Sequence, residues 1–304
     1  MLRYAAKYLA SPLLNVTTII LLVFLLMNAL PSDPARVRLG VRYNKEDAQA
    51  LRERYGLDKP LAHQFVIYLG ELVQGNFGTS IRTGEQIKDG LAERVPRSAT
   101  LVFLSLAIAS IAVVPAVYGA FRPSRSFELL EGGLLNLSVV PSFVTGALAI
   151  FAATTFLGVS LIASGPDSLT HYLVPAVLLS AYPAFALYKV TRDTMQETLD
   201  QPYIQTYRAF GFSWTRVTRV ALRICGPSIL GIATNLVAYY LSSIFIIEFL
   251  FSLGGIGAWG VNSAQNYDTP VVLATVVVSA LIYNATNVFT SLLAPVLDPR
   301  VLDR

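Results

Sequence analysis

The sequence predicts an all-α integral membrane protein with six transmembrane helices. The chain of 304 residues is 54% hydrophobic and only 14% charged, which is too little charge to cover a soluble domain of this length. Its apolar residues are gathered into runs, several of which reach the roughly 20 residues that cross a bilayer. The single cysteine, Cys225, excludes an internal disulfide and argues against a cysteine-based metal site.

Six apolar runs can be placed in order. The first would extend about 33 Å as a helix, which suits a hydrocarbon core of about 30 Å, and no clean cleavage site follows it, so we expect a retained anchor. The fourth contains Pro175 and Pro183, which a transmembrane helix tolerates when neighbours satisfy the freed carbonyl groups. The predicted spans are residues 9–30, 98–121, 133–157, 171–189, 226–252 and 271–295.

The long segment 31–97 separates the first two spans and holds 11 basic and 9 acidic residues. The stretch KEDAQALRERYGLDKP (45–60) predicts a short amphipathic helix that ends near Gly56. The stretch QFVIYLGELVQGNFG (64–78) predicts a second helix, because its apolar residues follow helical spacing. Two compatible interpretations stay open, namely a small folded cap on the membrane surface and a docking surface for an external partner.

Lysine and arginine residues predict the orientation. With the N-terminus in the cytoplasm, the inside segments hold 12 of the 23 basic residues, whereas the short outside loops 158–170 and 253–270 hold none. Segment 31–97 is too long for this rule and is placed outside. The predicted division is an N-terminal span 1–30, an external segment 31–97, a core of five spans 98–295 that includes a cytoplasmic loop 190–225, and a cytoplasmic tail 296–304.

The cytoplasmic loop contains TYRAFGFSWTRVTRVAL (206–222), which is basic and has no acid. Tyr203, Tyr207 and Phe210 have the spacing of one helix face. Gly211 would permit a sharp turn, and Ser213 could cap a second, basic helix. In that helix the residues Val217, Val220, Ala221 and Ile224 would face away from the arginines. The pair is either an interfacial element held by anionic lipid headgroups or a rigid knob for a cytoplasmic partner, and the aromatic face favours the knob.

Glu248, in SSIFIIEFLF, is the main ionisable residue within a predicted span. A carboxylate is costly at membrane depth, so it should either reach the outer interface or line a translocation path or outer gate. The chain has no G-x-x-x-x-G-K-[ST] phosphate loop, no H-E-x-x-H motif and no G-x-S-x-G motif. We therefore expect no enzymatic activity, no cofactor and no metal site in this chain, and no nucleic-acid partner.

The basic cytoplasmic segment resembles the coupling loop of ABC importer permeases of the dipeptide/oligopeptide/nickel group, which carries a pattern like Y-x-x-T-A-R-A-K-G-L. Tyr203, Thr206, Arg208, Ala209 and Gly211 are in register with it, and Tyr207 and Phe210 stand at differing positions. Other stretches are similar to signatures of the group's B-type subunit: LPSDP (30–34), GLDKPLAHQ (56–64), GNFGTS (75–80), RVPRSATL (94–101), EFLFSLGGIG (248–257) and APVLDPR (294–300).

The resemblance implies a permease-like fold and a permease subunit of an ATP-driven, binding-protein-dependent importer in a bacterial or archaeal plasma (inner) membrane. The solute would be a peptide or a related small polar molecule, with nickel chelates also open. The implied partners are a second homologous permease, two cytoplasmic ATPases that bind ATP and Mg²⁺, and an external substrate-binding protein. A secondary transporter or channel without an ATPase, and a membrane scaffold, are the alternatives.

The resemblance also implies roles for particular residues. Arg208 would pair with acids of the ATPase or with Glu197 or Asp200 of this chain. The residues implied in ATPase coupling are Tyr203, Thr206, Tyr207, Arg208, Ala209, Phe210 and Gly211. The residues implied at the translocation path or outer gate are Glu248, Gly254, Gly255 and Gly257.

Overall fold

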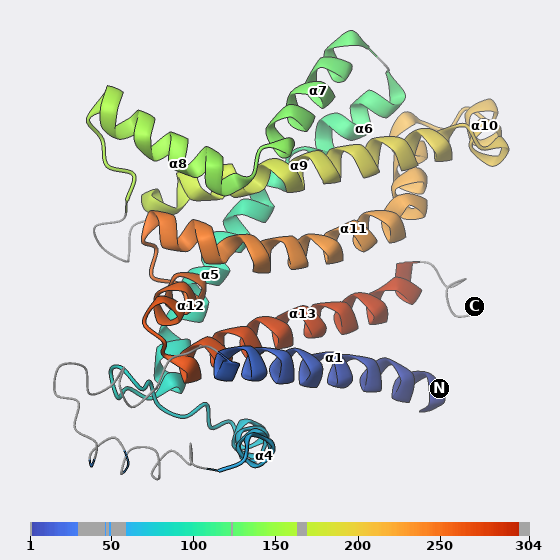
Figure 1. The fold of residues 1–304 in the computed structure, drawn as a ribbon. Helices are drawn as coiled ribbons and strands as arrows, with labels where there is room; N and C mark the ends of the chain where they lie inside the picture. The colour runs from blue at the N-terminus through green and yellow to red at the C-terminus, as the bar shows by residue number, and fades with distance from the viewer. Residues whose placement is uncertain are drawn as a thin grey trace. The chain divides into compact units, whose positions relative to one another are not determined.

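The computed structural model describes residues 2–29, 46, 49, 59–122, 124–162 and 169–297. These residues are helical over most of their length (Figure 1), and their extended pairing is limited to one isolated bridge between Thr79 and Gln86. The all-α class is therefore confirmed. The chain forms two compact units, one made of residues 1–98 with 252–284 and the other of 99–251 with 285–304.

The first unit contains helices α1 (Leu2–Ala29), α4 (Leu61–Val73) and α12 (Ile256–Gln265), together with the first parts of α5 (Ile87–Ser110) and α13 (Thr269–Leu297). The ring of Phe24 on α1 lies 5.4 Å from that of Phe65 and 6.5 Å from that of Tyr68, so α4 packs on α1 through its aromatic face. Helix α4 confirms the second helix predicted in segment 31–97. The helix predicted at 45–60 falls outside the described residues except for helical positions 46 and 49.

The second unit contains α6 (Val113–Phe121), α7 (Arg125–Val139), α8 (Ser142–Ala152) with a π-helical turn (Ala153–Leu157), α9 (Leu169–Leu199), α10 (Pro202–Ala209) and α11 (Trp214–Phe251). Helix α9 is central, because it packs against α6, α7, α8, α10 and α11 (Figure 1). One buried cluster joins Met195 and Leu199 at the end of α9 to Ile204 of α10 and to Val217 and Ala221 of α11. This cluster fixes the position of α10.

Two predicted boundaries change because prolines are accommodated within helices. Helix α9 passes through Pro175 and Pro183 and continues to Leu199, well beyond the predicted end at 189. Helix α11 has 38 residues and passes through Pro227, so the predicted basic helix and the predicted span 226–252 are one element. Its buried face continues from Val217 through Cys225 to Leu236, and this packing outweighs the local cost of the proline.

The predicted span 133–157 is not one straight helix. Helices α7 and α8 meet at a bend of 90°, with the break between Val139 and Ser142. Pro141 stands immediately before α8, and the preceding Val140 adopts an extended conformation with φ −79° and ψ 123°. A residue before proline disfavours the helical region, which explains why the helix stops there.

Four helical segments of the described chain are long and apolar enough to cross a membrane, and a fifth is obtained if the bent α7–α8 pair is one span. The four are Ile87–Phe121, His171–Leu199, Trp214–Phe251 and Thr269–Thr290. The first predicted span, 9–30, overlaps α1, which starts earlier, at Leu2, and has an apolar stretch over Leu14–Leu26. A membrane protein is thus supported, and the number six remains a prediction.

Candidate functional site

The segment predicted to be cytoplasmic forms a short helix, a glycine turn and a second helix. Helix α10 starts with Pro202, a residue suited to the first helical position, and ends at Ala209. Gly211 has φ +74°, in the left-handed region that glycine occupies readily. Its N–H donates to the carbonyl oxygen of Arg208 at 2.9 Å, and the N–H of Phe212 donates to that of Tyr207 at 3.2 Å. Helix α10 therefore ends in a tight reversal that leads directly into α11.

Burial on α10 differs from the predicted pattern of three exposed aromatic residues. Tyr203 is 44% exposed and Phe210 is 78% exposed. Tyr207 instead packs partly against the buried cluster, with its ring 5.2 Å from that of Phe212. The residue that anchors the helix is Ile204, which is fully buried and was not singled out from the sequence. The signal was available, because Ile204 is the only branched aliphatic residue in PYIQTYRA.

Within the chain, Arg208 contacts an aromatic ring rather than Glu197 or Asp200, and its predicted pairing with acids of the ATPase stays a prediction. Its guanidinium carbon lies 4.8 Å from the ring centre of Trp214, the first residue of α11, whereas the ion pairs in the described part of the chain do not join it to Glu197 or Asp200. The ring of Trp214 also meets the ring of Phe121 edge to face at 5.1 Å. The reversal at Gly211 explains the difference, since it brings the end of α10 beside the start of α11. The contact fastens α10 to α11.

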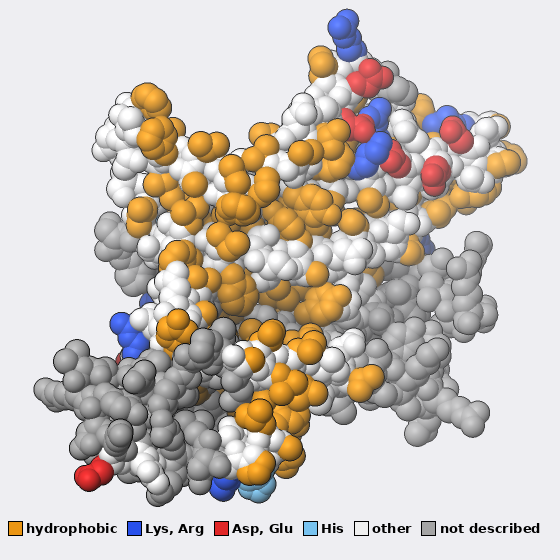
Figure 2. Space-filling model, in the orientation of Figure 1, with side chains coloured by type: hydrophobic (Ala, Val, Ile, Leu, Met, Phe, Trp, Pro, Cys, Tyr) orange, Lys and Arg blue, Asp and Glu red, His pale blue; other side chains and the backbone are white. Residues whose placement is uncertain are grey.

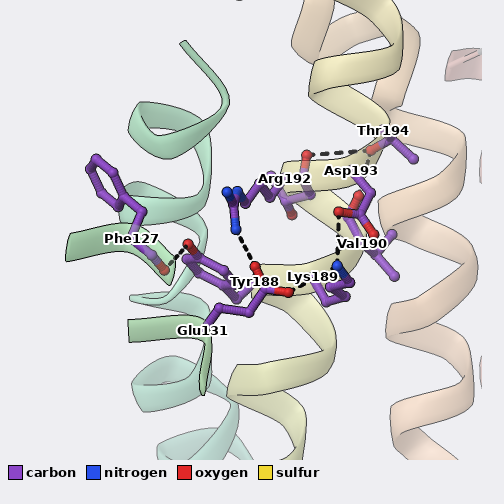
Figure 3. A network of polar contacts seen from close by, with 9 residues as sticks. Phe127, Glu131, Tyr188, Lys189, Val190, Arg192, Asp193 and Thr194 are labelled. Atoms are coloured by element: carbon purple, nitrogen blue, oxygen red, sulfur yellow. Dashed lines mark hydrogen bonds and ion pairs between the residues drawn. The ribbon is translucent and has the colours of Figure 1, made fainter. Parts of the chain in front are cut away.

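A cluster of charged residues fastens α7 to α9 (Figure 3). The Lys189 Nζ atom lies 2.9 Å from one carboxylate oxygen of Glu131 and 3.2 Å from a carboxylate oxygen of Asp193. Arg192, which is 9% exposed, pairs with the other carboxylate oxygen of Glu131. The Tyr188 hydroxyl donates to the carbonyl oxygen of Phe127 at 3.1 Å. From the sequence, Lys189 and Arg192 were counted only among the basic residues on the cytoplasmic side, and the position of Glu131 between them was not predicted.

A pocket of about 360 Å³ lies at the α7–α8 bend. Hydroxyl groups dominate its polar lining, and none of the described residues that line it is charged. The rings of Tyr182 on α9 and Tyr239 on α11 are 4.8 Å apart there. This pocket could not be predicted from the sequence, since its residues come from four helices and the α7–α8 bend. They are Ser138, Val140, Pro141, Ser142, Phe143, Tyr182, Tyr239, Ser242, Ser243 and Ile246.

The four residues predicted at the outer gate fall in different units. Glu248 lies on α11 in the second unit and is 1% exposed. Gly254, Gly255 and Gly257 lie in the first unit, where Gly254 has φ +64° and Gly255 immediately precedes α12. The side chains of α5 hold this glycine turn. The Arg97 Nη1 atom donates to the carbonyl oxygen of Gly254 at 3.4 Å, and the Ser98 hydroxyl oxygen accepts the N–H of Ile256 at 2.9 Å.

Asp268 is a further buried residue of the first unit that the sequence did not reveal. It is 3% exposed, and its carboxylate accepts hydrogen bonds from the Ser80 hydroxyl and, at 3.0 Å, from the N–H of Ile81. The Arg94 guanidinium carbon lies 4.6 Å from the centre of the Trp259 ring. RVPRSATL therefore contacts SLGGIG, and GNFGTS contacts Asp268, which follows α12 in the same unit.

Comparison with known proteins gives matches over nearly the whole chain. The family described as binding-protein-dependent transport system inner membrane component matches residues 110–303, and its N-terminal component matches residues 1–102. The dipeptide transport system permease protein of Lactococcus lactis subsp. cremoris is 34% identical over 99% of both chains. The oligopeptide transport system permease protein of Bacillus subtilis is 28% identical over 93% of this chain and 94% of that protein. The glutathione transport system permease protein of Escherichia coli K12 is 29% identical over 99% of both chains.

Proposed function

Because the chain belongs to the family of inner membrane components of binding-protein-dependent transport systems, we propose that it is the permease subunit of an ATP-driven importer for peptides or related small polar solutes. Three relatives are named as dipeptide, oligopeptide and glutathione transport system permeases, and these names support this solute class. The subunit would form half of the translocation pathway, and a second, homologous permease would form the other half. An external binding protein would deliver the solute, and ATP with Mg²⁺ would bind to two partner ATPases.

The shape of α10 is the observation that carries the coupling role. Ile204 fixes one face of this helix in the buried cluster, and the cation–π contact between Arg208 and Trp214 fixes its end. Tyr203 and Phe210 remain exposed on the resulting rigid element. Aromatic side chains on a rigid support are typical anchors of protein interfaces, because little conformational entropy is lost when they bind. Helix α10 would transmit the closure of the ATPases to α9 and α11, which it joins.

The hydroxyl-lined pocket is the better candidate for solute contact along the pathway. Serine and tyrosine hydroxyls both donate and accept hydrogen bonds, so they suit the alternating N–H and C=O groups of a peptide backbone. An uncharged lining also allows a passing solute to leave, because no fixed charge holds it. Glu248 is buried beside Ile247 in the α11 sequence, and its proposed role near the outer gate is secondary to that of this pocket.

Co-purification tests the coupling proposal. The chain would be tagged in its own host, isolated in mild detergent with its partners, and compared with the double variant Tyr203→Ala/Phe210→Ala. We expect the wild-type chain to retain a stoichiometric P-loop ATPase. We expect the double variant to bind the ATPase more than about 30-fold more weakly, since truncating an interface anchor costs about 2 kcal/mol or more.

The matched control is Phe156→Ala/Phe289→Ala, which removes two aromatic rings that are 76% and 61% exposed on other elements. It should leave the ATPase bound. Equal loss in both double variants would show that α10 is not the docking element. A preparation without any ATPase that still moves solute into liposomes would instead establish a secondary transporter.

A further inference from the structure

A groove of about 800 Å³ lies between α6 and the first turns of α11. Its walls are mainly apolar and include Val113, Val114 and Val117 from α6 and Leu222 from α11. Two arginines line it as well, Arg122 directly after α6 and Arg219 on α11. None of the described residues that line the groove is acidic, so the charge of this lining is positive.

The apolar and basic groups of the groove are separated along α6. Val113 opens this helix, and Arg122 follows its last residue. At 1.5 Å per residue the two positions are about 13 Å apart along the axis. The groove is therefore basic at the end of α6, with Arg219 on the facing wall, and its α6 wall is aliphatic. A ligand with an anionic group joined to a hydrocarbon chain would match both features.

Trp214 lies in the same groove and is 59% exposed. Its ring is held between Phe121, at 5.1 Å, and the guanidinium of Arg208, at 4.8 Å. Tryptophan is enriched where an apolar environment meets a polar one, as at the level of lipid headgroups. As the first residue of α11, Trp214 also places the positive end of that helix beside the groove, which adds to the attraction for an anion.

We propose that this groove binds one anionic phospholipid, with the phosphate between Arg122 and Arg219 and an acyl chain along the valines of α6. A lipid supplies both required chemistries in one molecule, and Ile87–Phe121, which includes α6, is a candidate membrane span. The orientation proposed above places the groove in the cytoplasmic leaflet, where anionic lipids attract basic residues. Figure 2 shows acidic and basic side chains gathered at the α7 and α10 end of the second unit, which fits a headgroup level there.

A bound lipid would act on the coupling segment through Trp214. The lipid would hold the indole against Phe121, and the same indole supports Arg208 at the end of α10. Loss of the lipid would loosen α10 without removing any residue of its exposed face. This consequence rests on the proposed function, whereas the lipid site does not.

Native mass spectrometry of the complete transporter in detergent tests the binding. The probes are dioleoylphosphatidylglycerol and dioleoylphosphatidylcholine. We expect selective retention of the anionic lipid by the wild type. The variant Arg122→Gln/Arg219→Gln should weaken it by about 25-fold, since each arginine contributes about fivefold near an anionic lipid. Glycerol 3-phosphate, which lacks acyl chains, should not displace the lipid.

Two further variants make the result specific. Arg125→Gln/Arg223→Gln removes the same charge from residues outside the groove and should retain the lipid. Val114→Trp keeps both arginines but fills the groove, and should lose the lipid. The proposal is overturned if both double variants weaken binding equally, if Val114→Trp still binds, or if glycerol 3-phosphate competes. It is also overturned if a cysteine at position 114 cross-links to a partner subunit, because a protein then fills the groove.

The consequence for coupling is tested separately in nanodiscs. Phosphatidylglycerol should raise the solute-stimulated ATPase rate several-fold over phosphatidylcholine alone, and Arg122→Gln/Arg219→Gln should abolish this difference while the ATPases remain bound. If the variant loses the lipid but keeps the full rate, the regulatory role is wrong and the binding site stands. Loss of the ATPases themselves from the wild type would contradict the proposed function instead.

Discussion

At Gly211 the backbone conformation, rather than the surrounding space, restricts the residue type. A Cβ atom there would meet nothing within 4 Å, but φ is +74°. Gly211→Val should therefore cost about 1–2 kcal/mol through strain in the left-handed region. We expect the strain to shift the reversal between α10 and α11, so that uptake and solute-stimulated ATPase activity fall together at unchanged protein level.

Two substitutions control for this effect. Gly211→Asn should retain most activity, because asparagine tolerates the left-handed region. Gly231→Ala lies within α11, also with open space around the added Cβ, and should be neutral or stabilising by about 0.5–1 kcal/mol. Normal uptake by Gly211→Val at normal abundance would show that the turn does not set the position of α10.

Tyr239 offers a test of solute contact in the hydroxyl-lined pocket. Tyr239→Phe removes one hydroxyl and keeps the ring, whose centre lies 4.8 Å from that of Tyr182. We expect the KM for peptide uptake to rise about 2- to 10-fold, the equivalent of one hydrogen bond worth about 0.5–1.5 kcal/mol. Transport by reconstituted complexes at several peptide concentrations measures the change.

The neighbouring tyrosine is the matched control. Tyr240 is 2% exposed, and its hydroxyl bonds with that of Ser105 at 3.2 Å rather than lining the pocket. Tyr240→Phe should lower thermal stability slightly and leave KM unchanged. A similar KM change in both variants would remove the reason to assign the pocket to the pathway.

Among the elements, α7 depends on one carboxylate for its attachment to α9. Glu131→Gln would leave Lys189 and Arg192 without their shared partner, and Arg192 is largely buried. Breaking a fully buried pair costs about 3–5 kcal/mol, and because the Glu131 side chain is 20% exposed we expect about 2 kcal/mol. The apparent Tm of the purified protein should fall by several degrees.

Glu128 provides the control on the same helix. It is exposed and lies in the first turn of α7, so Glu128→Gln should change the Tm little. If the two variants have the same Tm, the charged cluster does not hold α7 to α9.

The sequence predicts the existence of these helices better than their limits. Apolar runs of spanning length identified α9, α11 and α13, because lipid forces backbone hydrogen bonds to be satisfied within a helix. The effect of proline was not predictable from the local pattern. Pro183 and Pro227 lie within continuous helices, whereas Pro141 marks a 90° bend. The difference depends on whether packing against other helices compensates the lost hydrogen bond, which only the fold reveals.

At the scale of the whole molecule, contacts distant in sequence were beyond prediction. The link between Ser80 and Asp268 spans 188 residues, and that between Glu131 and Arg192 spans 61. Neither pair follows a periodic pattern, so a single sequence carries no signal that joins them. The turn at Gly211 was predictable because its conformational requirement is local. The anchor Ile204 and the hydroxyl-lined pocket required the packed structure.

The exposed apolar surface indicates that the chain lies within a bilayer. In the most apolar stretch of Trp214–Phe251 only 17% of the residues are buried within the chain, and in that of Ile87–Phe121 only 22%. Most of this surface must therefore contact lipid or other subunits, as expected for one half of a pathway. Which contacts are made depends on how many times the chain crosses the membrane, and the α7–α8 bend decides that number.

Cysteine labelling from either side of the membrane would determine the number of crossings. Cys225, which is buried, would be replaced by serine, and single cysteines would be placed at exposed Ser124, Ser160 and Gln205. We expect positions 124 and 205 to react with a membrane-impermeant maleimide only in inverted vesicles, and position 160 only in intact cells. If the α7–α8 pair crosses once, positions 124 and 160 lie on opposite sides. Labelling of both from the same side would establish a re-entrant loop, reduce the predicted six spans to five, and place the two chain termini on opposite sides of the membrane.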